Sequence, residues 1–361
     1  MISSRHFSLA AMILTAWLSS ASSFALDVPV AFPKGYICHR PSSPIVIDGK
    51  LDERAWNEVP YTDDFVDIEG DARPRPRFRT RAKMLWDDTY FYVAAELEEP
   101  HVWGTLTKHD SVIFQDNDFE IFIDPDGDHH EYYEIELNAL NTEWDLLLDA
   151  PYRNGGPARN TWEIPGLKTA VHIDGSLNDP SDVDRSWTVE FAIPWTVLAE
   201  FAHRPAPPGN GDQWRLNFSR VEWQVDVNGK TTRKVQGKKE DNWVWSPQGA
   251  IDMHRPETWG YVQFTTEEPG KATFRRDASV PIRERLMRIY HAEQAYFGEH
   301  HRFTDSLAAL NLLDEADKPK TSAPKIQITA KGFEASIDDD APKPRTYRVR
   351  ENSRLSVSNE R

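Results

Sequence analysis

Three aspartates alternate in one short acidic segment, DPDGD, at Asp124, Asp126 and Asp128. This spacing is similar to the start of a calcium-binding loop, because Ca²⁺ takes roughly six to eight oxygen ligands. It departs from an EF-hand, since Gly127 comes two positions early and no flanking helices are predicted. A solvated hairpin turn with Gly127 at positive φ explains the same residues. The sequence leaves both interpretations open, a turn alone or a turn pinned by a structural calcium ion.

Carboxylates also gather on one face of the two strands predicted on either side of this segment. Alternation gives each strand an apolar face and a polar face. The second face carries Glu120, Phe122 and Asp124 on the first strand, and Glu134, Glu136 and Asn138 on the second. Aromatic rings can stack on a sugar while carboxylate and amide groups bind its hydroxyls. An ordinary solvated sheet face has the same pattern, so these strands alone do not distinguish a sugar-binding site from a solvated surface.

The elements that hold these residues are predicted to be strands. From about residue 35 to residue 266, short alternating runs recur between turns rich in Pro, Gly, Asp and Asn. RAKMLWDD leads into YFYVAAELEE through a turn at residues 87–89, and Pro194 starts a short helix. Regular strands separated by turns are typical of antiparallel sheets. The predicted fold class is mainly β, an antiparallel two-sheet β-sandwich of jelly-roll-like form.

The last part of the chain differs in character. Twelve of the 13 tryptophans lie between Trp56 and Trp259, and none follows. Apolar residues at helical spacing predict a helix at residues 280–301, and FTDSLAAL predicts a second, short one. Two hairpin-like stretches follow. We therefore predict a β-sandwich domain at residues 36–266 and a small α+β domain at residues 270–361.

The N-terminus has the features of a signal peptide. A short apolar run follows two basic residues, and small residues lead to a cleavage site after Ala25. No later segment is apolar enough for a membrane helix. We expect residues 1–25 to be removed and the protein to be exported, as a periplasmic or secreted soluble protein.

Charge and cysteine content limit the partners. Residues 270–361 hold 17 basic and 14 acidic side chains, so residues 1–269 carry a net charge of −19. A field of this sign disfavours nucleic acid and anionic membranes and is compatible with neutral ligands and divalent cations. Cys38 is the single cysteine, which excludes an intrachain disulfide.

Six segments, in order, resemble family 9 carbohydrate-binding modules and their DOMON-related cousins. They are Ile45–Pro60, Leu85–Pro100, Asp116–Asp128, Tyr132–Asp145, Trp187–Trp195 and Arg255–Phe264. The resemblance covers roughly residues 36–266. It implies a β-sandwich, often with bound calcium, that in the best-known members holds a sugar end between two tryptophan rings.

The resemblance also implies site residues, and this chain departs from some of them. Phe114 stands at the first ring of the sugar clamp, and Glu120 and Asn138 match the family's polar residues. Glu136 stands where the family has an arginine, which reverses the charge. The second tryptophan falls near Met253. Trp245 is a candidate for a replacement ring.

The resulting prediction is an exported, non-catalytic protein that binds a polysaccharide or oligosaccharide and assists glycan-degrading enzymes of the xylanase type. No G-x-S-x-G, H-E-x-x-H or phosphate-binding glycine loop is present, and we expect no glycosidase barrel to fit in this length. Two alternatives stay open. One is a structural cell-envelope protein that binds a partner through its tail, where RLMRIYHAEQAYFGEHHRFTDSLAAL resembles the soluble part of pseudopilins. The other is a haem module, for which Met253 or His254 would need a second ligand, because strand neighbours point to opposite faces.

Overall fold

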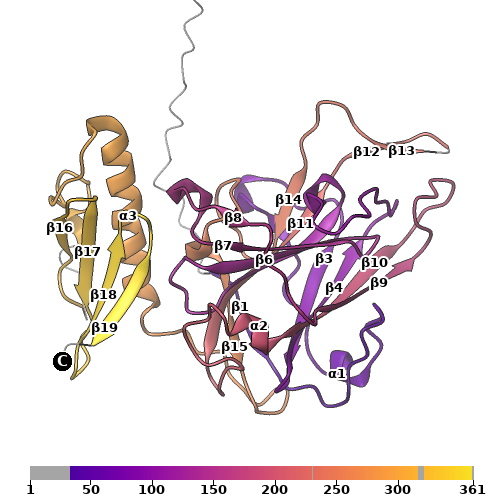
Figure 1. Cartoon of the computed structure of the whole chain (residues 1–361), viewed down its shortest axis with the longest axis horizontal. Helices are drawn as coiled ribbons and strands as arrows, with labels where there is room; N and C mark the ends of the chain where they lie inside the picture. Colours follow the sequence, from indigo (N-terminus) through magenta and orange to yellow (C-terminus); the bar gives the residue numbers. More distant parts are fainter. Residues whose placement is uncertain (1–32, 230, 316–320, 360–361) are drawn as a thin grey trace, which may run out of the picture.

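The structure, a computed structural model, describes residues 33–229, 231–315 and 321–359. The predicted signal peptide at residues 1–25 lies outside these ranges. In the described part of the chain two β-sheets form a sandwich, and a smaller sheet with one long helix lies beside it (Figure 1). This confirms the predicted fold class. No helix in the described ranges is long and apolar enough to cross a membrane.

The larger sheet of the sandwich carries most of the predicted site residues. Its strands run in the order β1-β15-β11-β5-β6-β7-β8, and β14 pairs with β11 and with β2. Their bounds are β1 (Gly35–Cys38), β15 (Gly260–Phe264), β11 (Gln213–Glu222), β5 (Asp118–Asp124), β6 (Tyr132–Asn138), β7 (Glu143–Leu148), β8 (Ala158–Arg159), β14 (Asp241–Val244) and β2 (Val66–Asp67). β1 pairs with β15 in parallel, and the other pairs are antiparallel.

The smaller sheet of the sandwich has the order β3-β4-β10-β9. Its strands are β3 (Thr80–Trp86), β4 (Tyr90–Glu98), β10 (Ser186–Pro194) and β9 (Lys168–Asp174). The turn predicted at residues 87–89 joins β3 to β4, and the side chain of Asp87 accepts hydrogen bonds from the amides of Thr89 and Tyr90. The apolar faces of the two sheets enclose the main core, which includes Trp86 and Phe119.

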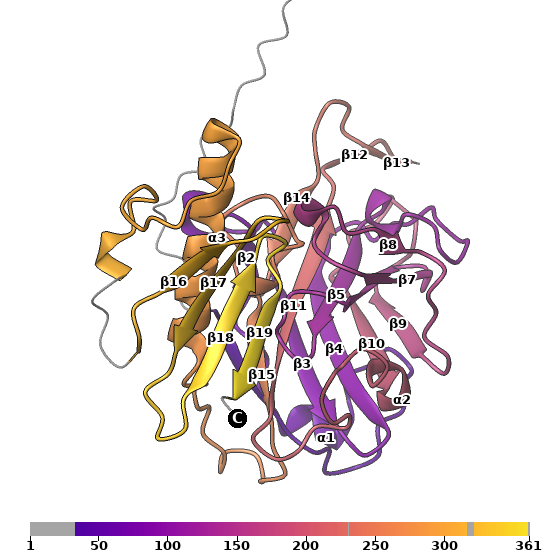
Figure 2. The same cartoon turned by 60° about the vertical axis from the view of Figure 1, so that its left-hand side comes forward.

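A separate core lies in the tail. Helix α3 (Val280–His300) packs on an antiparallel sheet whose order is β16-β17-β18-β19, seen face-on in Figure 2. Its strands are β16 (Lys325–Ile328), β17 (Phe333–Asp338), β18 (Arg345–Arg350) and β19 (Leu355–Asn359). Leu286 and Ile289 of the helix share this core with Phe333 and Val349.

The long tail helix confirms the prediction for residues 280–301, but the short helix predicted from FTDSLAAL is wrong. The chain makes isolated turns there and reverses at Asn311, which has a positive φ of 57°. Phe303 and Leu307 still pack against the tail core, so their apolar spacing reflects burial without a helix.

Short elements complete the chain. Helix α2 (Trp195–Leu198) starts after Pro194 as predicted, and α1 (Arg54–Asn57) lies between β1 and β2 in the chain. β12 (Val225–Val227) and β13 (Thr232–Lys234) form a hairpin. The 3-10 turns are η1 (Gly70–Ala72), η2 (Ile113–Gln115), η3 (Tyr152–Asn154), η4 (Pro256–Thr258) and η5 (Leu313–Glu315).

Candidate functional site

A pocket of about 270 Å³ opens over the outer face of the larger sheet. Alternation along β5 buries Phe119 and Ile121 in the core and turns Glu120 and Phe122 into the pocket. The same alternation along β6 supplies two more acids. The lining residues are Ile68, Phe114, Glu120, Phe122, Glu134, Glu136, Trp144, Tyr152, Val221, Glu240, Asn242, Ile251, Asp252, Met253 and His254. The pocket is therefore acidic and aromatic, as the strand pattern indicates.

Three carboxylates converge at the floor of this pocket, two that line it and a third, Asp118, that is fully buried. One oxygen from each of Asp118, Glu120 and Glu136 lies within 4.8 Å of the other two, and all three residues are buried. The backbone amide of Phe114 donates to Glu136 Oε2 at 2.9 Å, and that of Val221 donates to Asp118 Oδ1 at 3.1 Å. Asp118 Oδ2 and Glu120 Oε2 have no hydrogen-bond partner.

Burial and mutual repulsion hold these groups toward the neutral form. Burial raises the pKa of Glu120 to about 7. Burial, followed by the negative charges of Glu120, Asp118 and Glu134, raises the pKa of Glu136 well above its ordinary value. Burial and the charge of Glu120 do the same for Asp118. Crowded carboxylates of this kind are common at functional sites, although ion-pair networks produce similar shifts.

Aromatic side chains form the walls. Phe114 belongs to η2, and its carbonyl accepts a hydrogen bond from the Trp223 indole at 2.9 Å. Tyr152 is half-exposed, and its ring centroid lies 4.3 Å from that of His254. His254 Nδ1 also lies 3.0 Å from the Tyr132 hydroxyl. Hydrogen bonds thus hold the backbone of Phe114 and the ring of His254 in these walls.

The structure brings four of the predicted sugar-binding residues together. Phe114, Glu120, Glu136 and Met253 all line the pocket, although they come from η2, β5, β6 and a bend before η4. Met253 and His254 line it together, because residues 252–254 are not in a strand and do not alternate. The premise that they point to opposite faces is thus corrected.

Two other predicted residues do not reach the pocket. Trp245 is 1% exposed and packs in the main core beside Phe218, so its ring has no free face for stacking. The side chain of Asn138 is used entirely within the fold: Nδ2 donates to Leu106 O and to Asp116 Oδ2, and Oδ1 accepts two backbone amides. These findings correct the expectations for both residues.

Sequence reasoning missed other pocket residues. Tyr152, Asp252 and His254 lie on connecting segments, where no periodicity indicates which way a side chain points. The position of Trp144 could have been predicted, because it is the cross-strand neighbour of Glu136 in the β6–β7 register. Its place next to the acids follows from pairing the two strands correctly.

The acidic segment between β5 and β6 is a compact turn. Oxygens of Asp124, Asp126 and Asp128 lie within 4.8 Å of one another. Asp124 accepts hydrogen bonds from the amides of Gly127 and His129, and Gly127 has a positive φ of 67°. Burial, then the charges of the other two aspartates, raises the pKa of Asp124 well above its ordinary value. These three carboxylates are the predicted calcium ligands.

The tail docks on this turn. Arg354 Nε donates to Asp128 Oδ2 at 2.8 Å, and the amide of Leu355 donates to the carbonyl of Asp128 at 3.0 Å. His130 Nε2 lies 2.9 Å from the carbonyl of Asn352. An arginine from the tail therefore offsets part of the negative charge of the turn.

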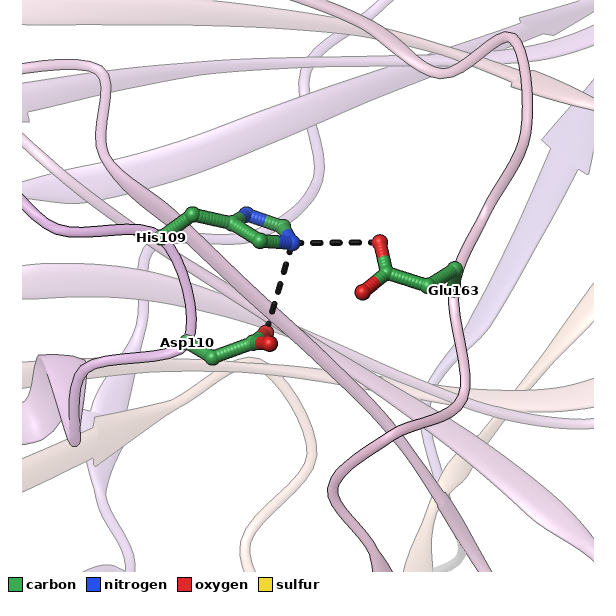
Figure 3. Close-up of side chains that lie close together, drawn as sticks. All are labelled: His109, Asp110 and Glu163. Carbon is green, nitrogen blue, oxygen red and sulfur yellow. Dashed lines mark hydrogen bonds and ion pairs between the residues drawn. The ribbon is translucent and has the colours of Figure 1, made fainter.

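A third group of ligand-type residues lies on the surface, shown in Figure 3. His109 Nε2 is 3.1 Å from Glu163 Oε2 and 3.4 Å from Asp110 Oδ1. Partial burial opposes protonation of His109, but the hydrogen bond to Glu163 and the charges of Asp110 and Asp145 raise its pKa. His109 and Glu163 are 54 positions apart in loops, so their meeting could not be foreseen from spacing.

A larger hollow of about 610 Å³ lies over the smaller sheet. Its lining combines aliphatic side chains with Tyr90, Tyr92, Lys168, Thr169 and a single acid, Glu143. It lacks the convergent carboxylates of the other pocket. We therefore take the acidic pocket as the candidate site.

Comparisons with known proteins match the domain that holds this pocket. A family model described as "Carbohydrate family 9 binding domain-like" matches residues 47–265, which include every strand that forms the pocket. The chain is 28% identical over 153 residues to "Exoglucanase XynX" of Acetivibrio thermocellus, covering 42% of this chain and 12% of that protein. It is 28% identical over 187 residues to "Endo-1,4-beta-xylanase A" of Thermoanaerobacterium saccharolyticum, covering 52% of this chain and 13% of that protein. The match thus spans about an eighth of each relative's length.

A solved structure has a similar fold. It is a carbohydrate binding module family 9 from Caldicellulosiruptor kristjanssonii in complex with cellotriose, with 16% identity and a TM-score of 0.44, covering 68% of this chain and 100% of that one. The family model matches more than half of the chain. The protein belongs to the family of carbohydrate family 9 binding domain-like proteins.

Proposed function

We propose that this chain is an exported, non-catalytic carbohydrate-binding protein whose acidic pocket takes a sugar of a polysaccharide or oligosaccharide. The observation that carries the proposal is the pocket itself, where Phe114 and Tyr152 stand beside Glu120 and Glu136 on the domain matched by the family. Aromatic rings provide apolar faces for a pyranose, and carboxylates accept hydrogen bonds from its hydroxyls.

The acids at the floor suit the binding of hydroxyl groups. Oxygens of Asp118, Glu120 and Glu136 lie within 4.8 Å of one another on one side of the pocket. Carboxylate oxygens placed together in this way can accept hydrogen bonds from neighbouring hydroxyls of one sugar ring.

The names of the relatives suggest a role. Both are glycan-degrading enzymes by name, an exoglucanase and an endo-xylanase, in which the matched part is a small fraction of the whole. We infer that this chain acts alongside such enzymes by holding glycan near them. Export through residues 1–25 is part of the same proposal, since polymeric glycans lie outside the cell.

Affinity electrophoresis and calorimetry on the full chain test the proposal. The ligands are xylan, soluble cellulose and cellotriose, each with calcium and with a chelator. We expect retardation by at least one glycan and about a tenfold loss of affinity in Phe114→Ala, because stacking contributes on the order of 1–1.5 kcal/mol. Phe297→Ala is the matched control, since Phe297 is an exposed phenylalanine on α3, far along the chain from the pocket.

A flat result would change the assignment. If folded wild-type protein binds none of these glycans under either condition, the sugar proposal fails. The partner-binding envelope protein would then be the better reading, and a partner captured through the tail would be the next measurement.

Calcium in the acidic turn stays a prediction. What supports it is the approach of oxygens from Asp124, Asp126 and Asp128 to within 4.8 Å of one another. The amides that Asp124 accepts and the arginine on Asp128 also explain the turn without an ion. Loss of calcium binding in Asp126→Asn would support an ion there, and unchanged binding would favour the turn alone.

A further inference from the structure

The floor of the pocket holds three buried carboxyl groups that form no ion pair with any described residue. Among the described ion pairs none involves Asp118, Glu120 or Glu136, whereas Glu222 pairs with Arg220 and Glu257 with Arg153. The buried Glu190 has no described ion pair either, but the Trp56 indole and two backbone amides donate to it. Because ionised carboxylates in one buried cluster repel one another, a cation from solvent would stabilise their charged form.

Unused oxygen atoms mark where the counter-charge would sit. Asp118 is 0% and Glu120 is 4% exposed, yet Asp118 Oδ2 and Glu120 Oε2 lack any partner. Ser219 lies opposite Glu120 in the β11–β5 register and is fully buried, and its hydroxyl favours the ionised form of that carboxyl by hydrogen bonding. Two carboxyl oxygens are thus withdrawn from water and left without a partner, which folded proteins generally avoid.

The dimensions suit a metal ion. Oxygens of the three carboxylates lie within 4.8 Å of one another, about twice the roughly 2.3–2.6 Å that separates Ca²⁺ from its oxygen ligands. The donors are all hard oxygens, without the histidine or thiolate that favours zinc or copper. Glu120 and Glu136 face the open pocket, where water or ligand oxygens can fill the positions that the protein leaves empty.

We propose that Asp118, Glu120 and Glu136 bind a calcium-class divalent cation at the pocket floor, and that this cation binds glycan hydroxyl or carboxylate oxygens directly. The second half rests on the proposed carbohydrate-binding function. A sugar-borne ammonium group is the competing cation, but it would have to enter through the pocket. Asp118 is fully buried and is not among the pocket-lining residues, so a bare ion reaches it more readily than an amine attached to a ring.

Calcium titration of the chelator-treated full chain tests the cation site. Calorimetry is run on wild type, Asp118→Asn and Glu120→Gln, with Asp126→Asn as the control for the acidic turn. We expect a binding event that is weakened at least about tenfold in the two pocket variants and kept in Asp126→Asn. The same isotherm in wild type and both pocket variants, or a loss confined to Asp126→Asn, would overturn the proposal.

Two further readouts separate binding from misfolding. Calcium should raise the melting temperature of wild type more than that of Glu120→Gln, because only a folded site gains from the ligand. Terbium bound at the floor should be sensitised by Trp144, which lies opposite Glu136, so Trp144→Phe should lower its emission. Equal melting shifts in both proteins, or emission unchanged by Trp144→Phe, would place the ion elsewhere.

Glycan binding with calcium and with chelator tests the second half. Affinity that disappears with chelator and in Glu120→Gln supports a bridging cation. Affinity unchanged by both overturns the inference and leaves the carbohydrate-binding function standing. Calcium binding at the floor without affinity for any glycan supports the cation site and refutes the function. Affinity for amine-bearing glycans alone, in chelator, would replace the metal by an ammonium group.

Discussion

Arg220 is the residue whose loss should damage the sandwich most directly. It is 0% exposed, and its Nη2 lies 2.9 Å from Glu99 Oε2 and 2.8 Å from Glu222 Oε2. Nη1 donates to Thr80 Oγ1 at 3.0 Å and to the carbonyl of Glu98 at 2.8 Å. Arg220 belongs to β11 of the larger sheet, and its partners include groups on β3 and β4 of the smaller one. The side chain therefore ties the two sheets together.

The cost of Arg220→Met follows from what it leaves behind. Glu99 and Glu222 are both 2% exposed. Without Arg220, only the longer Arg77–Glu222 contact, at 3.6 Å, and the Asn117 amide offset their like charges among the described residues. Removing one partner of a buried ion pair costs about 3–5 kcal/mol. Burial already raises the pKa of Glu222, and the substitution raises it further by removing the opposing charge. Since a raised carboxyl pKa destabilises the folded state as pH rises above the unfolded value near 4.5, the loss should be larger at pH 8 than at pH 5.

Urea unfolding followed by tryptophan fluorescence measures this loss in the sandwich alone, because no tryptophan follows Trp259. Arg185→Met is the matched control: Arg185 pairs with Asp174 on the exposed surface, where a pair contributes about 0–1 kcal/mol. Adding Glu99→Gln and Glu222→Gln to Arg220→Met should restore most of the stability. A loss below about 1 kcal/mol at pH 8, similar to the control, would refute the role given to Arg220.

The remaining predictions concern the contact between tail and sandwich. Burial opposes ionisation of Glu257, but the charges of Arg153 and His291 hold its pKa well below the ordinary value. The stabilisation by ionised Glu257 is thus present above about pH 4.5 and is lost as the pH falls. Glu257→Gln should therefore cost about 2–4 kcal/mol at pH 7, and its melting temperature should fall less steeply with acid than that of wild type. The same fall in melting temperature in both proteins would contradict this. Arg354→Ala should cost only about 0.5–1 kcal/mol, because the pair with Asp128 is partly exposed, yet it should speed hydrogen exchange at the amide of residue 355. Unchanged exchange would mean that the backbone contact holds without the arginine.

Alternation along strands is what made the sandwich and its pocket floor predictable. Side-chain parity placed Glu120 and Glu136 on the outer face and their neighbours in the core, because a period of two follows from strand geometry alone. In the arginine-rich segment at residues 73–81, Arg77 pairs with Asp241 and Arg81 pairs with Glu96. The local sequence pattern is sufficient to predict the direction of a side chain wherever that direction depends only on the two faces of one strand.

The rest of the site depends on contacts between distant segments. Trp245 and Met253 lie eight positions apart, yet one is core and the other lines the pocket, and no local pattern separates them. Asn138 is a residue type that can bind sugar hydroxyls, but its side-chain amide donates to Asp116 and Leu106, which lie in a segment before β5. Loop residues such as His254 take their direction from packing, which only the folded chain provides.

The pocket floor and the Arg220 network both bury carboxylates close together, and they differ in how that repulsion is offset. Antiparallel pairing sets Glu120 opposite Glu136, and like charges in such a pair destabilise a sheet. Around Glu99 and Glu222 the chain supplies an arginine from within β11. At the pocket floor the described residues supply none, although the same alternation could have placed one there. Because Glu120 and Glu136 line an open pocket, a cation from solvent can supply that charge.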